Sequence, residues 1–343
     1  DGGALWEPKV AGLPLSTKGN RVGLAALGTT LFYTNSTSIY RSTDGGSTWA
    51  PVTGTLPVNA SAGRRLHSVH VHGGSVFASI NTDGIYRSGD SGDTWTRKNS
   101  GIFDGGPTQE SLATVDADVF VAGGAGIYRS TDNGESWTTS HEGIHHAVIH
   151  DLLWHGGALY AATEAGVAYS ADDGVTWVQG GGISVPGINA IAADGSVLYA
   201  AARGWPNGEA VIKSTDDGAS WTPVSPADET IYRVVAHGGY VFAASRGAGV
   251  FRTSDGGTTW IGVNNGLTGS ALSSSFVISR ASRLLLAAYD GLYYSDDAGD
   301  NWTLSSLAGP SVLALYDAGA TVYASTTDGS IYTSSDDGST WVT

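Results

Sequence analysis

The sequence predicts an all-β fold made of eight repeated four-stranded units, and three observations support this. The first is a stretch with the consensus Ser/Thr-x-Asp-x-Gly-x-Ser/Thr-Trp, which occurs eight times, with Asn301 replacing the hydroxyl residue in the seventh copy. The second is its spacing, because successive tryptophans from Trp49 to Trp341 are 46, 42, 40, 44, 39, 42 and 39 residues apart. The third is the alternation of apolar and polar residues between glycine-rich turns, which is typical of short strands and hairpins. Four strands per period of about forty residues predict a β-propeller.

The second repeat shows how one unit is built. Residues 66–74 (LHSVHVHGG) alternate and end in a glycine pair, and residues 75–80, 85–88 and 94–99 follow as three further strands. The third strands are expected to begin at Ile39, Ile85, Ile127, Val167, Val211, Val250, Leu292 and Ile331. Eight such sets predict eight antiparallel blades, with seven blades and a spare unit as the alternative.

The repeats run through nearly the whole chain, so residues 1–343 are expected to form a single propeller domain. Residues 4–14 (ALWEPKVAGLP) are similar to residues 48–57 (TWAPVTGTLP), which form a fourth strand in the prediction. We therefore expect residues 5–10 to supply or complete the outer strand of the last blade, which would close the ring and remove an open edge. The spacing leaves open whether Trp6 or Trp341 fills the last tryptophan position.

The composition excludes several classes of partner and site. The net charge of −15 argues against nucleic acid, although 15 of the 32 acidic residues belong to the repeated stretches themselves. The chain has no cysteine, which excludes disulfides, thiolate metal sites and a cysteine nucleophile. The chain contains no run of about eighteen apolar residues, so no membrane span is predicted. The missing initial methionine and the start DGGALW are consistent with a processed N-terminus, although an artificially trimmed chain would look the same. A secreted or periplasmic protein is expected.

The repeated stretches resemble the Asp-box, or bacterial neuraminidase repeat, of sialidases, xyloglucan-active glycosidases, sortilin-type receptors and photosystem II assembly factors. The resemblance implies that each box is a turn between third and fourth strands, far from the ligand. The residue types suit this role: aspartate accepts hydrogen bonds from following amides, glycine takes a positive φ, and tryptophan covers the turn. The expected structural residues are Asp44, Asp90, Asp132, Asp172, Asp216, Asp255, Asp297, Asp336, Trp49, Trp95, Trp137, Trp177, Trp221, Trp260, Trp302 and Trp341.

In propellers of this type the ligand is usually carried by the face that holds the loops between second and third strands and the loops between blades. The candidates are Asn35, Asp83, Glu164, Arg203, Arg246, Asp290 and Asp328 in the first kind of loop, and Arg64, Arg65, His145, His146, Asp228 and Glu229 in the second. The longest loop, residues 202–210, places Trp205 outside any strand, beside Arg203, Asn207 and Glu209. Trp205 could stack on a sugar ring or anchor a protein loop; packing on the neighbouring blade is the alternative.

The histidines do not predict a metal site. His141, His145, His146 and His150 cluster with Glu142 and Asp151. This segment leads into a new first strand, where alternate side chains point apart. The boxes also lack the acidic residue at the twelfth position that a calcium loop of the D-x-D-x-G type requires. We therefore expect no metal and no cofactor.

The sequence favours a binding protein over an enzyme. A sialidase resemblance would imply an Arg-Ile-Pro motif, which is absent, and xyloglucanases with repeats similar to YRSTDGGSTW use two propellers with one catalytic Asp from each. Glycoside hydrolysis needs a carboxylate pair, and nothing in the spacing of Asp83, Glu164, Asp290 and Asp328 singles out two. The assembly-factor resemblance implies an arginine patch, of which only Arg64 and Arg65 are candidates. The prediction is a non-catalytic propeller that recognises a carbohydrate or protein ligand around the central channel; the alternative is a glycoside hydrolase acting on a polysaccharide. The oligomeric state is not indicated.

Overall fold

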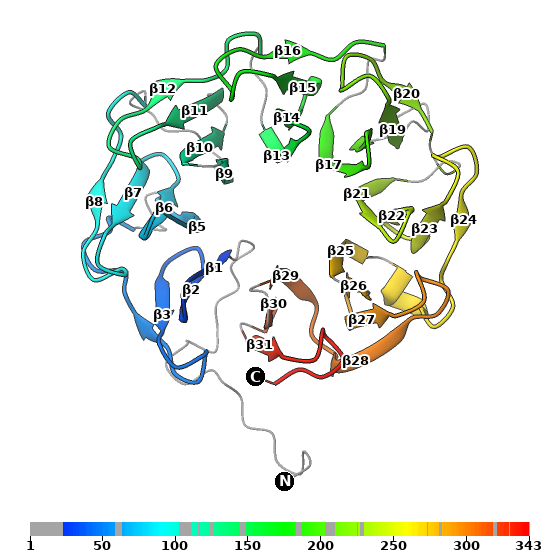
Figure 1. The fold of residues 1–343 in the computed structure, drawn as a ribbon. Helices are drawn as coiled ribbons and strands as arrows, with labels where there is room; N and C mark the ends of the chain where they lie inside the picture. The colour runs from blue at the N-terminus through cyan, green and yellow to red at the C-terminus, as the bar shows by residue number, and fades with distance from the viewer. Residues whose placement is uncertain are drawn as a thin grey trace. The chain divides into compact units, whose positions relative to one another are not determined.

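The structure is a computed structural model in which part of the chain is described. The described residues are 23–58, 64–102, 111–115, 117–123, 126–144, 149–182, 187–202, 210–224, 226, 230–272, 274–280, 283–317, 321–328 and 330–342. Eight antiparallel sheets follow one another along these residues (Figure 1). The protein is an all-β, eight-bladed β-propeller, so the predicted blade number is confirmed and the seven-blade alternative is wrong.

Contacts divide the chain into two units, each of four sheets, which are described separately. The first unit holds residues 1–139 and 312–343, and the second holds residues 140–311. The prediction of one domain over residues 1–343 stays a prediction.

The first unit contains three four-stranded sheets and one three-stranded sheet, each in sequential strand order. The strands of its first two sheets are β1 (Gly23–Leu27), β2 (Thr30–Thr34), β3 (Ile39–Ser42), β4 (Ala50–Pro51), β5 (Leu66–His72), β6 (Ser75–Ile80), β7 (Gly84–Ser88) and β8 (Thr96–Arg97). The others are β9 (Ser111–Val115), β10 (Asp118–Gly123), β11 (Gly126–Ser130), β12 (Thr138–Thr139), β29 (Val312–Asp317), β30 (Val322–Thr326) and β31 (Ile331–Ser334).

The second unit contains four four-stranded sheets, also in sequential order, and a short 3-10 helix, η2 (Gly269–Leu272). The first two sheets are built from β13 (Ile149–His155), β14 (Ala158–Thr163), β15 (Gly166–Ser170), β16 (Val178–Gln179), β17 (Ile188–Asp194), β18 (Val197–Ala202), β19 (Val211–Ser214) and β20 (Thr222–Pro223). The next two contain β21 (Ile231–His237), β22 (Tyr240–Ser245), β23 (Val250–Thr253), β24 (Ile261–Gly262), β25 (Ser274–Arg280), β26 (Arg283–Ala288), β27 (Gly291–Ser295) and β28 (Thr303–Ala308).

The hydrophobic core lies between neighbouring sheets, because both faces of each second strand are covered. All six residues of β6 are buried, and Phe32 of β2 packs in one cluster with Val76 of β6 and Trp95. The predicted starts of the third strands agree with the structure to within one residue. The strands that follow the boxes are mostly two residues long, because the chain then turns toward the next sheet.

Each box forms a tight turn held by its own side chains. In the second box, Asp90 Oδ1 accepts hydrogen bonds from Ser88 Oγ at 2.7 Å and Thr94 N at 2.9 Å, and Asp90 Oδ2 accepts one from Thr94 Oγ1 at 2.6 Å. Gly92 N donates to Ser88 Oγ at 2.7 Å, with φ of +94° at Gly92. The Thr94 hydroxyl, then the Thr94 amide and the Ser88 hydroxyl, lower the pKa of Asp90 to about 2. The box aspartate is thus saturated with donors from its own turn.

Basic residues of the third strands join one sheet to the next. Arg41 Nη1 donates to the carbonyl of Ser91 in the following box at 2.8 Å, and Arg252 Nη1 donates to the carbonyl of Ala298 at 2.6 Å. Lys213 Nζ makes the corresponding contact with the carbonyl of Gly256. These basic side chains therefore connect neighbouring sheets within each unit.

The last sheet has three strands within the described residues, followed by a bridge between Thr333 and Val342. Trp341 is buried, and its Nε1 donates to the carbonyl of Gly338 at 2.8 Å. Trp341 therefore fills the tryptophan position of the last box. Residues 5–10, which were predicted to complete the outer strand of this sheet, lie outside the described residues.

Candidate functional site

The inner strands of the second unit carry bulges at one end. The pairing register shifts between Ile149 and Asp151 in β13, between Ile188 and Ala190 in β17, and between Ile231 and Arg233 in β21. The residues that the strand register passes over at these shifts are His150, Asn189 and Tyr232. Because an inner strand runs antiparallel to the second strand, its start lies beside the turn that leads to the third strand. A bulge at this place re-aims a side chain at the sheet edge.

These bulges and the neighbouring turns define a group of residues that we call the second-unit rim. It comprises His150, Glu164, Tyr232, Arg246, Tyr289 and Asp290. Backbone hydrogen bonds tie two of these turns to the segments that precede the next inner strands: Gly187 N, just before β17, donates to Glu164 O at 3.1 Å, and Gly249 N donates to Leu272 O of η2 at 2.9 Å. The rim therefore follows one end of the sheets in this unit.

Glu164 was predicted in this group, and the structure pairs it with a bulge residue. His150 Nε2 lies 2.7 Å from Glu164 Oε1. A histidine and a carboxylate at this distance form a hydrogen bond, and an ion pair when the ring is protonated. His150 is thus a partner of Glu164.

Arg246 and Asp290 were also predicted, and both lie in the rim. Arg246 is exposed, and its N–H donates to Thr230 O at 3.0 Å. Asp290 Oδ2 lies 3.4 Å from Tyr293 Oη, whereas Asp290 Oδ1 is buried and has no hydrogen-bond partner in the described part of the chain. The adjacent Tyr289 is 60% exposed, which is unusual for so large a side chain.

Asp151 and Arg233 lie on the inner strands next to the bulges. Asp151 accepts hydrogen bonds from Leu152 N at 3.1 Å and from Ile191 N of the next sheet at 3.2 Å. Burial raises the pKa of Asp151, and the charge of Arg233 opposes this shift. Sequence reasoning missed Arg233, Tyr232 and Tyr289. Only Tyr289, an aromatic residue in a turn beside Asp290, had a visible signal.

Replacing Asp151 with asparagine is expected to stabilise the fold more at pH 7 than near pH 4. The raised folded-state pKa means that ionisation of Asp151 opposes folding as the pH rises above the usual value of 3.8. The amide removes this pH-dependent loss and keeps one acceptor for the neighbouring backbone. Urea unfolding of both proteins across this pH range measures the effect, with Asp194→Asn as control. A stability difference that does not change with pH would contradict the expectation.

The loop with Trp205 leaves the same end of the second unit. Residues 203–209, including Arg203, Trp205 and Asn207, lie outside the described residues. The loop begins after β18 and ends before β19, and Ala202 N donates to Ala210 O at 2.9 Å across its base. Its place in the chain is thus that of the turns in the rim.

In the first unit, Asp83 is the centre of a polar cluster. Tyr86 Oη donates to Asp83 Oδ2 at 2.6 Å, and Arg64 and Arg97 each place a guanidinium nitrogen 3.9 Å from Asp83 Oδ1. Burial, then the hydrogen bond to Asp83, raises the pKa of Tyr86. The structure thus brings Arg64 and Asp83 together. The exposed Arg65 forms a backbone contact with Asn81.

The remaining predicted residues of the first unit are held by their own turns. Asp328 Oδ1 accepts hydrogen bonds from Thr326 Oγ1 at 2.6 Å and from Ser330 N at 3.0 Å. Asn35 is buried, and its Oδ1 accepts hydrogen bonds from the N–H groups of Thr37 and Ser38. Their side-chain contacts are therefore local. The interblade candidates His145, His146, Asp228 and Glu229 lie outside the described residues.

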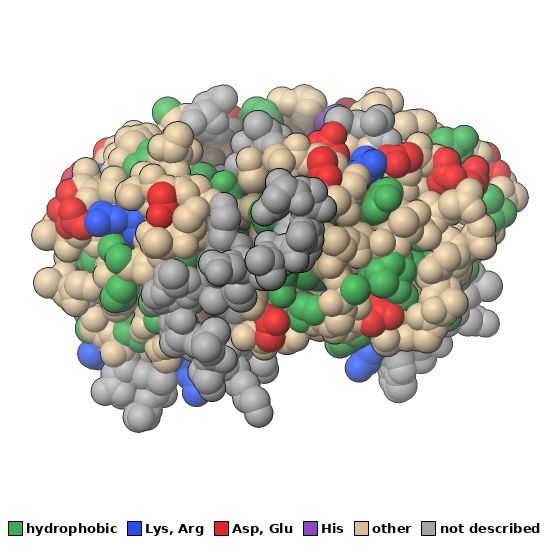
Figure 2. Space-filling model, turned by 90° about the horizontal axis from the view of Figure 1, so that it is seen from below, with side chains coloured by type: hydrophobic (Ala, Val, Ile, Leu, Met, Phe, Trp, Pro, Cys, Tyr) green, Lys and Arg blue, Asp and Glu red, His purple; other side chains and the backbone are tan. Residues whose placement is uncertain are grey.

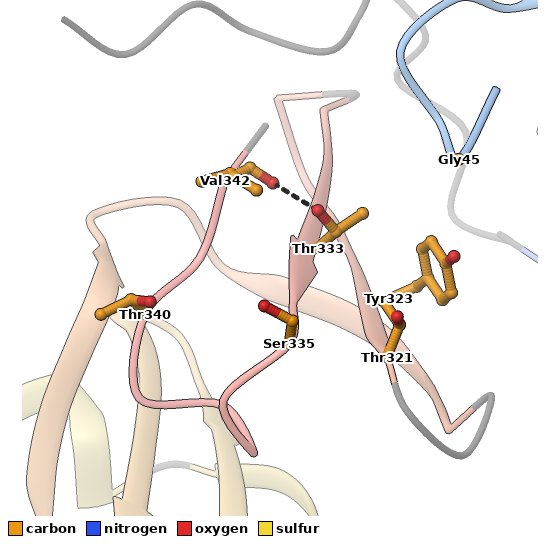
Figure 3. Close-up of a pocket in the computed structure, with 7 residues that line it drawn as sticks. All are labelled: Gly45, Thr321, Tyr323, Thr333, Ser335, Thr340 and Val342. Carbon is orange, nitrogen blue, oxygen red and sulfur yellow. Dashed lines mark hydrogen bonds between the residues drawn. The ribbon is translucent and has the colours of Figure 1, made fainter. Parts of the chain in front are cut away.

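A groove between the last and the first sheet lies on the side of the boxes. One part has a volume of about 310 Å³ and is lined by Gly45, Thr321, Tyr323, Thr333, Ser335, Thr340 and Val342 (Figure 3). A second part, of about 370 Å³, shares Gly45, Thr321 and Tyr323 and extends to the turn at Gly28. The dashed line in Figure 3 is the contact of Thr333 Oγ1 with Val342 O at 3.4 Å. This groove was not predicted, because its lining residues come from the two ends of the described chain and no sequence motif marks it.

The surface agrees with the acidic composition. Figure 2 shows several groups of acidic side chains on the face in view, some of them beside basic ones. Within the described ranges, no three His, Asp or Glu residues are grouped so that they could bind a metal ion. The same residues contain no helix with the length and apolarity needed to cross a bilayer.

Comparisons with known proteins give the fold and a partial family match. A family model described as the DUF6242 beta propeller domain matches residues 233–343, less than half of the chain. A search of curated proteins gave no significant match. Among solved structures, the chain is similar to the Dos1 propeller, with 13% identity and a TM-score of 0.70 over 96% of this chain and 94% of that chain. It is also similar to the computationally designed protein Ika8, with 11% identity and a TM-score of 0.68 over 95% of this chain and 99% of that chain. A third similar structure is that of YCF48 bound to D1 peptide, with 14% identity and a TM-score of 0.62 over 97% of each chain. At these identities, the similarity concerns the fold alone.

Proposed function

We propose that this chain is a non-catalytic binding propeller that recognises a protein ligand through the second-unit rim. The observation that carries the proposal is the turn of Tyr289 and Asp290, where a 60% exposed aromatic ring adjoins a carboxylate with one unsatisfied oxygen. Unsatisfied buried acceptors are rare and costly, so a local shift of this turn that brings the oxygen to a ligand donor would be favoured on binding. The exposed Arg246 belongs to the same rim, and tyrosine and arginine are enriched among residues that dominate protein interfaces.

Two further findings support this proposal. The structure of YCF48 contains a D1 peptide, so a propeller of similar fold binds a polypeptide. In this chain, Glu164 is hydrogen-bonded to His150, and Asp83 is hydrogen-bonded to Tyr86. Carboxylates fixed by such partners suit the charged recognition of a ligand better than the acid and base roles of a glycoside hydrolase. The box aspartates are fully hydrogen-bonded in their turns, and we propose that they stabilise the scaffold.

Selection of peptides from a displayed library against the intact protein tests the proposal. Selected peptides are expected to bind Tyr289→Ala and Arg246→Ala about tenfold more weakly or worse, since truncation of a hot-spot side chain costs about 2 kcal/mol or more. Ile261→Ala provides a matched control, because Ile261 is an exposed side chain on an outer strand of the same unit.

Equal binding of the selected peptides to all three variants would contradict the rim as the site. Binding on a glycan array that is lost in Trp205→Ala would identify a carbohydrate ligand instead. Release of reducing sugar from a polysaccharide panel, abolished by Glu164→Gln or Asp290→Asn, would overturn the non-catalytic assignment.

A further inference from the structure

Two turns in different sheets share one local sequence. Residues 83–88 (DGIYRS) lead into β7 of the second sheet, and residues 290–295 (DGLYYS) lead into β27 of the seventh. In both turns the aspartate directly precedes a glycine, and the tyrosine three positions on donates a hydrogen bond to the aspartate. Asp290 therefore occupies the position in the seventh sheet that Asp83 occupies in the second.

In the second sheet, two arginines compensate the charge of this aspartate. Nη2 of Arg64 and Nη2 of Arg97 each lie 3.9 Å from Asp83 Oδ1. Arg97 also donates to the carbonyl oxygen of Asp83, through Nε at 3.1 Å and through Nη2 at 2.9 Å. Arg97 stands opposite Tyr86 in the pairing of β7 with β8. The strand position opposite the tyrosine therefore supplies a cation to the turn.

The seventh sheet has a leucine at this position. Leu304 stands opposite Tyr293 in the pairing of β27 with β28, and an added Cβ at Gly291 would be 3.2 Å from Leu304 Cδ1. The carbonyl oxygen of Asp290 accepts the N–H of Gly309 at 2.8 Å. Among the described residues, Asp290 forms no ion pair, and its buried Oδ1 has no hydrogen-bond partner. The turn thus has the carboxylate of the second sheet and lacks its cation.

The surroundings of Asp290 suit a basic side chain from outside. A carboxylate that is partly buried without a cation is costly, so a cation that reaches it is favoured. The hydrogen bond from Tyr293 is 3.4 Å long, against 2.6 Å in the second sheet, so the carboxylate is held less tightly and can turn outward. Leu304 is 43% exposed and Tyr289 is 60% exposed. Lysine and arginine pack their apolar stems on such surfaces, and tyrosine rings attract cations.

We propose that this turn binds one lysine or arginine side chain of the protein ligand, with Asp290 as its charge partner and with Leu304 and Tyr289 as apolar contacts. This inference rests on the proposed function, because the turn belongs to the second-unit rim, and it adds the chemistry of the group that the ligand supplies. The net charge of −15 agrees with it, since an acidic protein attracts basic partners. The ligand supplies to the seventh sheet what Arg97 supplies to the second.

Peptides selected on the intact protein from the displayed library test the inference. They are expected to contain lysine or arginine, and replacing that residue with norleucine, which keeps the stem and removes the charge, should weaken binding about tenfold. In Asp290→Asn this loss is expected to disappear, since the charge partner is gone. Asp217→Asn removes one exposed charge from a box of the same unit and should keep the loss. Equal losses in the wild type and in Asp290→Asn would overturn the inference.

Leu304→Arg supplies the missing cation from the protein itself. The introduced guanidinium is expected to pair with Asp290 as Arg97 pairs with Asp83, so the norleucine replacement should no longer weaken binding. Leu304→Gln, of similar length without the charge, should bind more weakly yet keep the preference for the basic peptides. Because Leu304 is exposed, both variants should fold, which circular dichroism checks. An unchanged preference in Leu304→Arg would contradict the inference.

The same peptides separate the failure of this inference from the failure of the proposed function. Selected peptides that lose affinity for Tyr289→Ala and Arg246→Ala but contain no lysine or arginine would refute the cation site and leave the rim as the binding surface. Peptides that bind these two variants as tightly as the wild type would refute the rim itself.

Discussion

Replacing Gly101 with alanine is expected to lower the unfolding free energy of the first unit by about 3–5 kcal/mol. The residue has φ of +92°, which costs an alanine about 1–2 kcal/mol. The added Cβ would also overlap the carbonyl oxygen of Trp137, so the linker or the tryptophan must move. Movement of either breaks the hydrogen bonds from Trp137 to Ser100 and Lys98.

Gly74→Ala is the matched control for this substitution. Gly74 also has a positive φ, +76°, but nothing lies within 4 Å of an added Cβ. Only the backbone cost of about 1–2 kcal/mol is therefore expected. Urea unfolding followed by tryptophan fluorescence and by circular dichroism measures both variants. Equal losses would show that the close approach to Trp137 contributes nothing.

Acidification is expected to unfold the protein between pH 3.8 and about 2. The pKa values of Asp44, Asp90, Asp132, Asp172, Asp216 and Asp255 are lowered from 3.8 to about 2, first of all by the hydroxyl at the end of each box. A carboxylate with a lowered folded-state pKa adds stability that is complete above its unfolded value and is lost as the pH falls through the folded value. Because the boxes repeat in every sheet, these losses accumulate over a narrow pH range.

Two adjacent aspartates separate this effect from general charge repulsion. Asp172→Asn leaves one acceptor oxygen for the two donors Thr176 N and Thr176 Oγ1, and is expected to lower stability at pH 7 and weaken the acid dependence. Asp173→Asn removes the same charge at a position with φ of +56°, where the third box has asparagine, and should change little. Circular dichroism along an acid titration gives the midpoint for each protein. Identical midpoints for the two variants would contradict a role of the box hydrogen bonds.

The fold could be predicted from sequence because its determinants are local and repeated. The box, the apolar alternation and the glycine turns each appear eight times. An ambiguous strand boundary in one repeat can therefore be placed by comparison with the other repeats. The starts of the third strands at Ile39, Val211 and Val250 agree for this reason. The two-residue outer strands could not be delimited, since the chain leaves the sheet wherever the next box requires it.

The candidate site was predictable only in part. The turn residues Glu164, Arg246 and Asp290 follow from strand order alone, because every turn between a second and third strand lies at one end of its sheet. The bulges that present His150 and Tyr232 depend on the fit between neighbouring inner strands, which no local pattern records. The groove beside Tyr323 arises from a junction of segments far apart in sequence, so its detection needed coordinates.

The contacts between neighbouring sheets have a direction along the chain, so the sheets associate head to tail. Arg41 reaches forward to the box of the following sheet, whereas Trp95 reaches back to the carbonyl of the preceding one. The second repeat, which contains Trp95 and also Arg87 bound to the carbonyl of Asn133, thus carries one complementary surface at each end, and both rely on backbone carbonyls that any sequence provides. A duplicated repeat would find matching neighbours wherever it was inserted. Growth of such a chain by gene duplication therefore requires no new recognition between repeats, and the number of copies is limited by geometry.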